Sequence, residues 1–289
     1  MKLSKTTTQS WNEKLSKSAI ALLKKHQEAS LFLLNTLKEH GVQKTDSAFS
    51  GDFQCLVCDD KVVGVFLLNG MGRLLLQTDK EADYSNLIID SILPKISRFT
   101  GLIGDWELTE QFLNALKLRF PTIKQKVCKK EILYRHDLGE SPKASNNENE
   151  SVRFLTAADY HSWDKLISGF REELNSVLFH NDPQKQQRYI GEVENRYWWG
   201  LFRGQKLITI CAYTAKFEDC AQIGGVYTLP EERGKGSAKQ IIKQVMLDSK
   251  NIHNVKKLVL FTHENNHSAQ KVYEGLGFKA IGYIGLITC

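Results

Sequence analysis

The strongest restriction on the fold comes from the stretch Gln222–Val245, which reads QIGGVYTLPEERGKGSAKQIIKQV. It begins as a strand, passes through a turn that holds Gly234 and Gly236, and continues as a helix whose apolar residues share one face. A strand, a glycine turn and a helix in succession leave several backbone N–H groups unpaired at the positive end of the helix dipole. That end of the helix is a site for a phosphate group.

Two well-known glycine motifs do not fit this turn. A Walker-type loop needs Ser or Thr after its lysine, but Lys235 is followed by Gly236. The dinucleotide fingerprint needs glycine or alanine at the position that Lys239 occupies. The sequence therefore disfavours a nucleotide triphosphatase and a nicotinamide dehydrogenase.

A third motif does fit, because Arg233, Gly236 and Ala238 fill the pattern Arg-x-x-Gly-x-Ala. Downstream, Asn266–Phe278 reads Asn-x-x-Ala-x-x-Val-Tyr-x-x-Leu-Gly-Phe. Together the two patterns resemble the GNAT superfamily of N-acetyltransferases, which bind acetyl-coenzyme A (acetyl-CoA), and the resemblance covers residues 152–289. The phrase VYTLPEERGKG further resembles a subgroup of predicted acetyltransferases with a GNAT-like N-terminal half.

The resemblance implies roles for residues in both patterns. In this family the loop holds the cofactor pyrophosphate, the main chain of the preceding strand pairs with the pantetheine arm, and an Asn and a Tyr lie near the thiol. Gly224 and Gly225 would permit the bulge by which that strand splays from the next one. The implied cofactor-binding residues are Val226, Tyr227, Thr228, Arg233, Gly234, Lys235, Gly236, Ser237, Ala238, Asn266 and Tyr273.

Two catalytic groups are expected. Tyr273 matches the family's proton donor to the leaving thiolate, although a tyrosine that only packs the helix on the sheet is the alternative. Many members carry the general base as a Glu on the strand before the loop, but AQIGGVYTL has no carboxylate. Our candidate base is Glu173, with Glu172 as its neighbour, acting through water; each could instead be a solvated helix charge. His180 and Tyr227 are weaker candidates.

The sequence divides into two halves. Residues 139–151, GESPKASNNENES, contain no large apolar residue, so we predict a linker there between domains 1–138 and 152–289. The first half has helix, hairpin, strand and helix in GNAT-like order but neither cofactor pattern. We therefore expect a degenerate GNAT-like repeat that binds no cofactor, and that either walls one side of the substrate groove or mediates a homodimer.

Hydrophobic periodicity predicts a mixed α/β sheet with helices on both faces. The second half reads β-α-α-β-β-β-α-β-α-β, with Thr156 and Asp159 as a capping box at its first helix. In the first half we expect one helix over Trp11–His40 and a hairpin over Phe53–Leu68. The last predicted element is a strand over Lys279–Ile287.

Composition limits the partners. The net charge of +6 comes without a basic run interleaved with aromatic residues, so no nucleic acid is expected. Cys55 and Cys58 lie three apart on a predicted strand and point to opposite faces, while His263 and His267 lack further ligands at metal spacing, so we expect no metal. Scattered cysteines and the lack of a long apolar run indicate a reduced, cytoplasmic protein that binds no membrane.

The leading functional hypothesis is an acetyl-CoA-dependent N-acetyltransferase with direct transfer to an amine. The acceptor is left open between a small amine, an amino acid and a protein lysine. Because the usual base is missing, the alternative is a non-catalytic CoA-binding regulatory module. A third hypothesis is a protein-interaction scaffold without cofactor.

Overall fold

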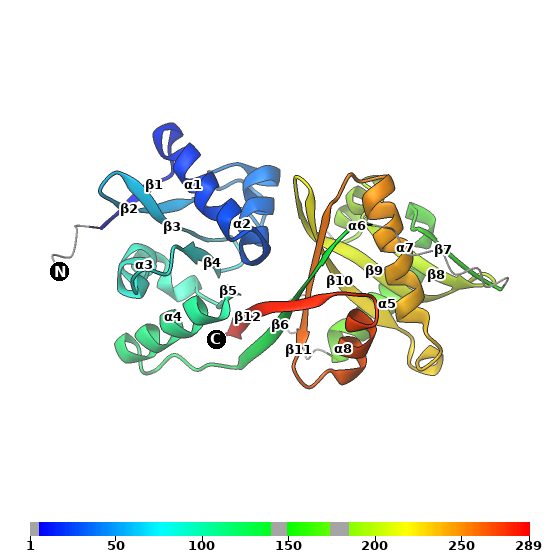
Figure 1. Cartoon of the computed structure of the whole chain (residues 1–289). Helices are drawn as coiled ribbons and strands as arrows, with labels where there is room; N and C mark the ends of the chain where they lie inside the picture. The colour runs from blue at the N-terminus through cyan, green and yellow to red at the C-terminus, as the bar shows by residue number, and fades with distance from the viewer. Residues whose placement is uncertain (1–5, 140–148, 174–184) are drawn as a thin grey trace. The chain divides into compact units, whose positions relative to one another are not determined.

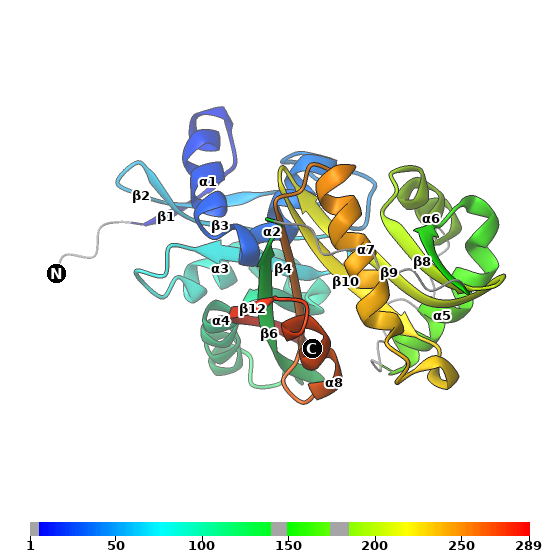
Figure 2. The same cartoon turned by 45° about the vertical axis from the view of Figure 1, so that its right-hand side comes forward.

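The structure, a computed structural model, describes residues 6–139, 149–173 and 185–289. The linker predicted at 139–151 falls mainly on residues 140–148, which lie outside the described residues, and the predicted domain boundary stays a prediction. Figure 1 shows the helices and strands along the chain, and Figure 2 shows them from a second direction.

The chain forms two compact units, and neither is continuous in sequence. Two segments near the C-terminus of the sequence belong to the first unit, and the second unit begins at Tyr134, inside a strand of the first half of the sequence. Unit 1 comprises Met1–Leu133, Phe261–Asn266 and Ala280–Cys289, and unit 2 comprises Tyr134–Leu260 and His267–Lys279.

Unit 1 is built on a mixed sheet in the strand order β1-β2-β3-β4-β5-β12. The predicted hairpin over Phe53–Leu68 is confirmed, and Asp59 and Asp60 take left-handed backbone angles in its turn (φ 46° and 63°). The polar strand β1 has no apolar alternation and was not predicted. The strands are β1 Thr7–Ser10, β2 Gln54–Cys58, β3 Lys61–Leu68, β4 Arg73–Thr78, β5 Gly101–Asp105 and β12 Lys279–Thr288.

Strand β12 confirms the predicted last strand, and its partner is a strand of the first half. It runs antiparallel to β5, with Ile284 opposite Asp105 and Thr288 opposite Gly101. On its other side β5 pairs in parallel with β4. Residues far apart in the sequence therefore complete the sheet of unit 1.

Helices cover both faces of the unit 1 sheet. The single helix predicted over Trp11–His40 is wrong, because the backbone leaves helical geometry at His26 (φ −116°, ψ 38°). The break lets the first helix pack on β3 and the second on β4, so that each buries its own apolar face. The helices are α1 Glu13–Lys25, α2 Gln27–His40, α3 Ser85–Ile92 and α4 Trp106–Arg119.

Unit 2 is built on strands in the order β11-β10-β9-β8-β7. These neighbours are antiparallel, except that β10 and β11 run parallel. Strand β6, Val127–Asp137, carries residues of both units. The unit 2 strands are β7 Glu150–Phe154, β8 Trp198–Arg203, β9 Lys206–Phe217, β10 Cys220–Thr228 and β11 Lys257–His263.

The helices of unit 2 also lie on both faces of their sheet. Trp198 and Trp199 are adjacent on β8 and therefore point to opposite faces. Trp198 joins the apolar cluster of α5 and α6, whereas Trp199 donates its indole N–H to Asp248 of α7 (2.8 Å). The predicted capping box of Thr156 and Asp159 is confirmed. The helices are α5 Tyr160–Glu173, α6 Lys185–Glu194, α7 Ser237–Asn251 and α8 His267–Glu274.

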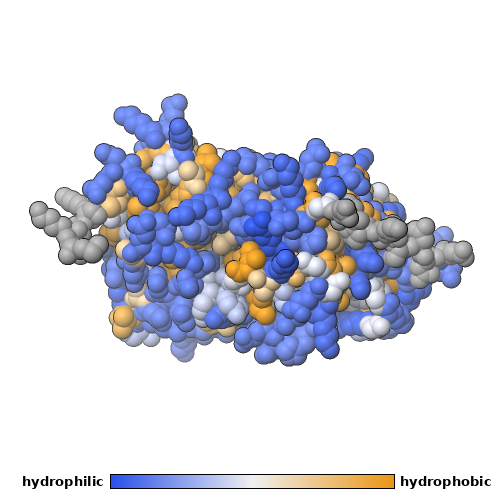
Figure 3. Space-filling model, in the orientation of Figure 1, coloured by the Kyte–Doolittle hydropathy of each residue, from blue (hydrophilic) through white to orange (hydrophobic). Residues whose placement is uncertain are grey.

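The surface is mostly polar where it can be seen. Hydrophilic residues cover most of the face drawn in Figure 3, and hydrophobic ones appear between them in small groups. None of the described helices combines the length and the hydropathy that crossing a bilayer requires.

Candidate functional site

The site begins where β10 parts from β11. The two strands pair in parallel only at Cys220–Gln222 and Lys257–Val259, at the start of each strand. Strand β10 continues to Thr228, and among the described residues its later positions do not pair with β11. The N–H and C=O groups on that edge can therefore pair with an extended ligand, as an added strand would.

A bulge in β10 confirms the one predicted at Gly224 and Gly225. The register with β9 shifts between Gln222 and Ile223, and again between Gly224 and Tyr227. Gly225 has φ +60°, which a residue with a side chain adopts at a cost. The bulge re-aims the main chain at the point where the open edge of β10 begins.

The glycine loop then brings β10 into α7. Gly234 and Gly236 both have positive φ (75° and 85°), and a Cβ atom built on either would meet nothing within 4 Å. Gly236 is the N-cap of α7 and offers no side chain to the first turn. The start of the helix is therefore open to a ligand, with unpaired backbone N–H groups facing outward.

Ser237 gives a second sign of a ligand at this helix end. Its side chain is 3% exposed, and its Oγ has no hydrogen-bond partner among the described residues. A buried hydroxyl without a partner destabilises a fold by about 1–3 kcal/mol. The hydroxyl thus remains an unpaired buried donor in the first turn of α7, where the backbone N–H groups are the donors that a phosphate could reach from outside.

The two cations of the loop are held by nearby acceptors. Arg233 donates to Oε1 of Glu173 (2.6 Å) and to the carbonyl of Thr228 (3.0 Å). Lys235 donates to Oε2 of Glu232 (2.9 Å) and to the carbonyl of Glu231. An arriving phosphate would compete with these carboxylates for the cations.

Glu173, the candidate base, thus lies beside the candidate pyrophosphate loop. Its Oε1 also accepts a hydrogen bond from the hydroxyl of Tyr227 (3.4 Å). Burial, with a smaller contribution from the Glu173 charge, raises the pKa of Tyr227. The structure therefore brings the candidate base Glu173 together with two residues of the glycine-loop stretch, Tyr227 and Arg233. Glu172 is exposed, and His180 lies outside the described residues.

The other predicted residues follow from the same elements. Val226 and Thr228 are half-buried on β10, and Thr228 shares a hydrogen bond with Thr209 (3.0 Å). Ala238 is half-buried in the first turn of α7. Asn266 is exposed directly before α8, and its N–H donates to the carbonyl of His263. Among residues 6–139, 149–173 and 185–289, no group of three His, Cys, Asp or Glu residues could hold a metal ion.

Tyr273, the candidate proton donor, lies on α8 against a tyrosine from the first half of the sequence. Its ring is 8% exposed and contacts the rings of Tyr134 (6.0 Å between centroids) and Phe278 (6.2 Å). Tyr134 donates its hydroxyl to Glu274 (2.8 Å), and burial together with this carboxylate raises the pKa of Tyr134 to about 12. No sequence pattern pointed to Tyr134 as a neighbour of Tyr273, because the two residues meet only once β6 has paired with its neighbours in the sheet.

Unit 1 repeats the strand arrangement without the basic loop. Strands β4 and β5 also pair in parallel only at their first positions, Arg73–Leu75 and Gly101–Ile103. The segment after β4 reads TDKEADYS, with Asp79, Glu81 and Asp83 where unit 2 has its glycine loop. These carboxylates would repel a pyrophosphate.

A family model decides the classification of the second half. Residues 163–278 match the model described as the acetyltransferase (GNAT) family. This part of the chain is a GNAT acetyltransferase domain. The matched span contains the bulged strand β10, the glycine loop, α7 and the α8 segment that ends at Phe278, so the expected family is confirmed there.

Solved structures extend the likeness to the whole length of the chain. A Drosophila protein aligns with a TM-score of 0.71 at 10% identity over 98% of each chain. A GCN5-related N-acetyltransferase from Sphaerobacter thermophilus aligns with a TM-score of 0.60 at 11% identity, over 98% of this chain and 94% of its own. A tandem GNAT protein from the clavulanic acid biosynthesis pathway aligns with a TM-score of 0.54 at 13% identity, over 98% and 97%. These likenesses confirm the predicted mixed α/β GNAT fold. No curated protein matches the sequence.

Proposed function

We propose that the GNAT domain is an acetyl-CoA-dependent N-acetyltransferase that transfers the acetyl group directly to an amine. The observation that carries the proposal is the succession of an open β10 edge, a glycine loop and an uncapped α7 with the buried hydroxyl of Ser237. Coenzyme A has a matching order of parts, since an amide-containing arm leads from its thiol to a pyrophosphate. Membership of the GNAT family supports an acyl-CoA donor.

In this proposal the cofactor lies along β10 and ends at α7. The pantetheine amides pair with the main chain of Val226, Tyr227 and Thr228. The pyrophosphate accepts hydrogen bonds from the backbone N–H groups of the loop and the first turn of α7. Asn266 binds the arm near α8. The residues that supply these N–H groups are Arg233, Gly234, Lys235, Gly236, Ser237 and Ala238.

The chain's own groups then support acetyl transfer. The backbone N–H of Tyr227, after the bulge, stabilises the oxyanion formed when the amine attacks the thioester. Tyr273 gives a proton to the departing thiolate, whose conjugate acid has a pKa of about 8.5. Glu173 takes a proton from the attacking ammonium through water. In the structure Glu173 forms an ion pair with Arg233. A pyrophosphate that binds Arg233 would break this pair and leave the carboxylate free to accept a proton.

Calorimetry with acetyl-CoA on a matched pair of glycine variants tests the cofactor site. Gly236→Glu places a carboxylate where the pyrophosphate should bind and should abolish binding. Gly204→Glu is the control, because Gly204 also has positive φ (57°) and open space around its Cβ position, but lies in the β8–β9 turn. Binding that survives in Gly236→Glu would show that the loop is not the pyrophosphate site.

Thiol release tests the reaction. The panel holds a small amine, a free amino acid and a lysine peptide, because nothing in the described residues selects among them. Release of CoA with any of these acceptors supports the transferase.

A non-catalytic CoA-binding regulatory module is the second candidate. The observation in its favour is that β10 carries no carboxylate at the site. Tight binding of acetyl-CoA, together with no thiol release on the whole panel, would favour this alternative over the transferase.

A further inference from the structure

The bulge of β10 lies against an aromatic ring that the cofactor patterns do not include. A Cβ atom built on Gly225 would lie 3.3 Å from Cη2 and 3.6 Å from Cζ3 of Trp198. The edge of the indole is therefore in van der Waals reach of the bulged main chain. It lies on the face of the sheet that α5 and α6 cover.

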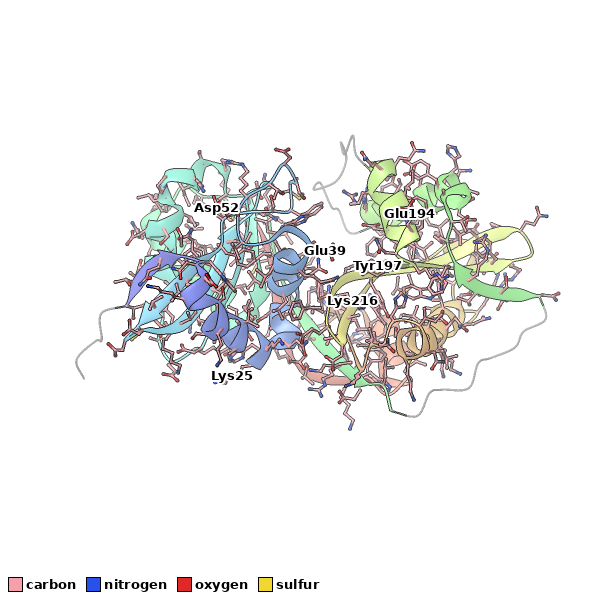
Figure 4. The ribbon with its side chains drawn as sticks, turned by 90° about the horizontal axis from the view of Figure 1, so that it is seen from above. Lys25, Glu39, Asp52, Glu194, Tyr197 and Lys216 are labelled. Atoms are coloured by element: carbon pink, nitrogen blue, oxygen red, sulfur yellow. The ribbon has the colours of Figure 1, made fainter. Side chains whose placement is uncertain are left out.

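The ring of Trp198 is fixed in this position from several sides. It is 7% exposed, and its indole N–H donates to Oε2 of Glu192 on α6 (2.6 Å). Its ring meets Trp163 of α5 edge-on, with 5.2 Å between centroids. Glu194 and Tyr197, labelled in Figure 4, mark the short turn by which α6 leads into β8 and so ties the helix to this strand.

Helix α5 also packs closely on β10 next to the bulge. A Cβ atom built on Gly169 of α5 would lie 2.6 Å from the hydroxyl of Tyr227, so α5 rests directly on β10 at this point. On the opposite face of the sheet, α7 fills the space with side chains that are fully buried, namely Ile241, Ile242 and Val245. The sheet is therefore closely packed on both faces here, and Trp198 is the ring that lies against the bulge itself.

We infer that Trp198 sets the length of the acyl group, admitting acetyl and excluding longer chains. The inference rests on the proposed function, since it requires the thioester carbonyl to bind at the bulge. A longer chain would meet the indole edge, and the hydrogen bond to Glu192 keeps the ring from swinging aside. Trp198 is thus a specificity-determining residue that acts by contact with the acyl chain.

Calorimetry with CoA, acetyl-CoA and hexanoyl-CoA tests this without knowledge of the acceptor. The wild-type protein should bind hexanoyl-CoA at least about tenfold more weakly than acetyl-CoA, while Trp198→Val should bind the two within about threefold of each other. Trp199→Val is the matched control, because Trp199 is equally large and buried but faces α7; its ratio should stay as in the wild type. Affinity for CoA itself and the melting temperature report whether each variant is folded.

A variant that keeps the ring gives a second test. Glu192→Gln weakens the hydrogen bond that holds the indole, and should bring the hexanoyl-to-acetyl ratio part of the way toward that of Trp198→Val. An unchanged ratio in both Trp198→Val and Glu192→Gln, with CoA binding intact, would overturn the role of Trp198 alone. If the wild-type protein binds none of CoA, acetyl-CoA and hexanoyl-CoA, the proposed function and this inference are both overturned.

Discussion

Replacing Glu173 by Gln tests the ion pair that holds Arg233. The substitution keeps the size of the side chain and removes its charge. The two side chains are 49% and 46% exposed, and an ion pair so exposed contributes at most about 1 kcal/mol. Because a pyrophosphate must break this pair to reach Arg233, Glu173→Gln should tighten acetyl-CoA binding by up to about fivefold.

Calorimetry at low and high salt measures the effect. Screening shortens the reach of exposed charges, so the gain in affinity should shrink at about 1 M salt. Glu172→Gln is the control, since it removes the same charge from the neighbouring, exposed residue and should leave the affinity unchanged. The same variant reports on catalysis, because loss of a general base should lower turnover by about 10²- to 10⁴-fold.

The two readouts separate the two roles of Glu173. If Glu173→Gln binds acetyl-CoA more tightly but turns over at the wild-type rate, Glu173 competes with the pyrophosphate for Arg233 and does not act as the general base. If Glu173→Gln binds acetyl-CoA no better than the wild type at low salt, Arg233 does not meet the pyrophosphate, and the reasoning from the ion pair is refuted.

Three further predictions concern single residues. Tyr273→Phe should lower turnover by about 10²- to 10³-fold with unchanged acetyl-CoA affinity, as measured by thiol release and calorimetry; an unaltered rate would end its role as the acid. Gly225→Ala should lower the free energy of unfolding in urea by about 1–2 kcal/mol, because φ is +60° and the new Cβ would press on Trp198; equal stability would contradict this strain. Hydrogen bonds from Arg153 hold the pKa of Asp159 below its usual value, so the stabilisation is present above an unfolded pKa of about 3.9 and is lost as pH falls through the folded pKa. Asp159→Asn should therefore be less stable by about 1 kcal/mol at pH 7, and the difference should vanish near pH 2 in denaturation curves; a gap that does not change with pH would be inconsistent with the ionised cap.

The sequence predicted the features that depend on nearby residues. The bulge at Gly224 and Gly225 follows from two adjacent residues without side chains, and the capping box follows from the spacing of Thr156 and Asp159. The hairpin of β2 and β3 follows from its turn residues. The family itself followed from two short patterns, because a phosphate loop and its downstream helix need particular residues at particular positions.

Contacts between distant segments could not be predicted in this way. The break at His26 has neither proline nor glycine to mark it, because it is set by how α1 and α2 pack on different strands. No local signal joins Glu173 to Arg233 or Trp198 to Gly225, since each pair meets only after the sheet and helices have assembled. Such contacts depend on the tertiary fold rather than on periodicity.

The pairing of β12 with β5 has a consequence for synthesis on the ribosome. About 180 residues separate Asp105 from its partner Ile284, which is roughly 10–35 s of translation at 5–20 residues per second. During that interval the edge of β5 lacks its strand, and an open edge can pair with other chains. The first half of the nascent chain therefore cannot close its sheet as it emerges, and a chaperone that shields β5 would protect it during this delay.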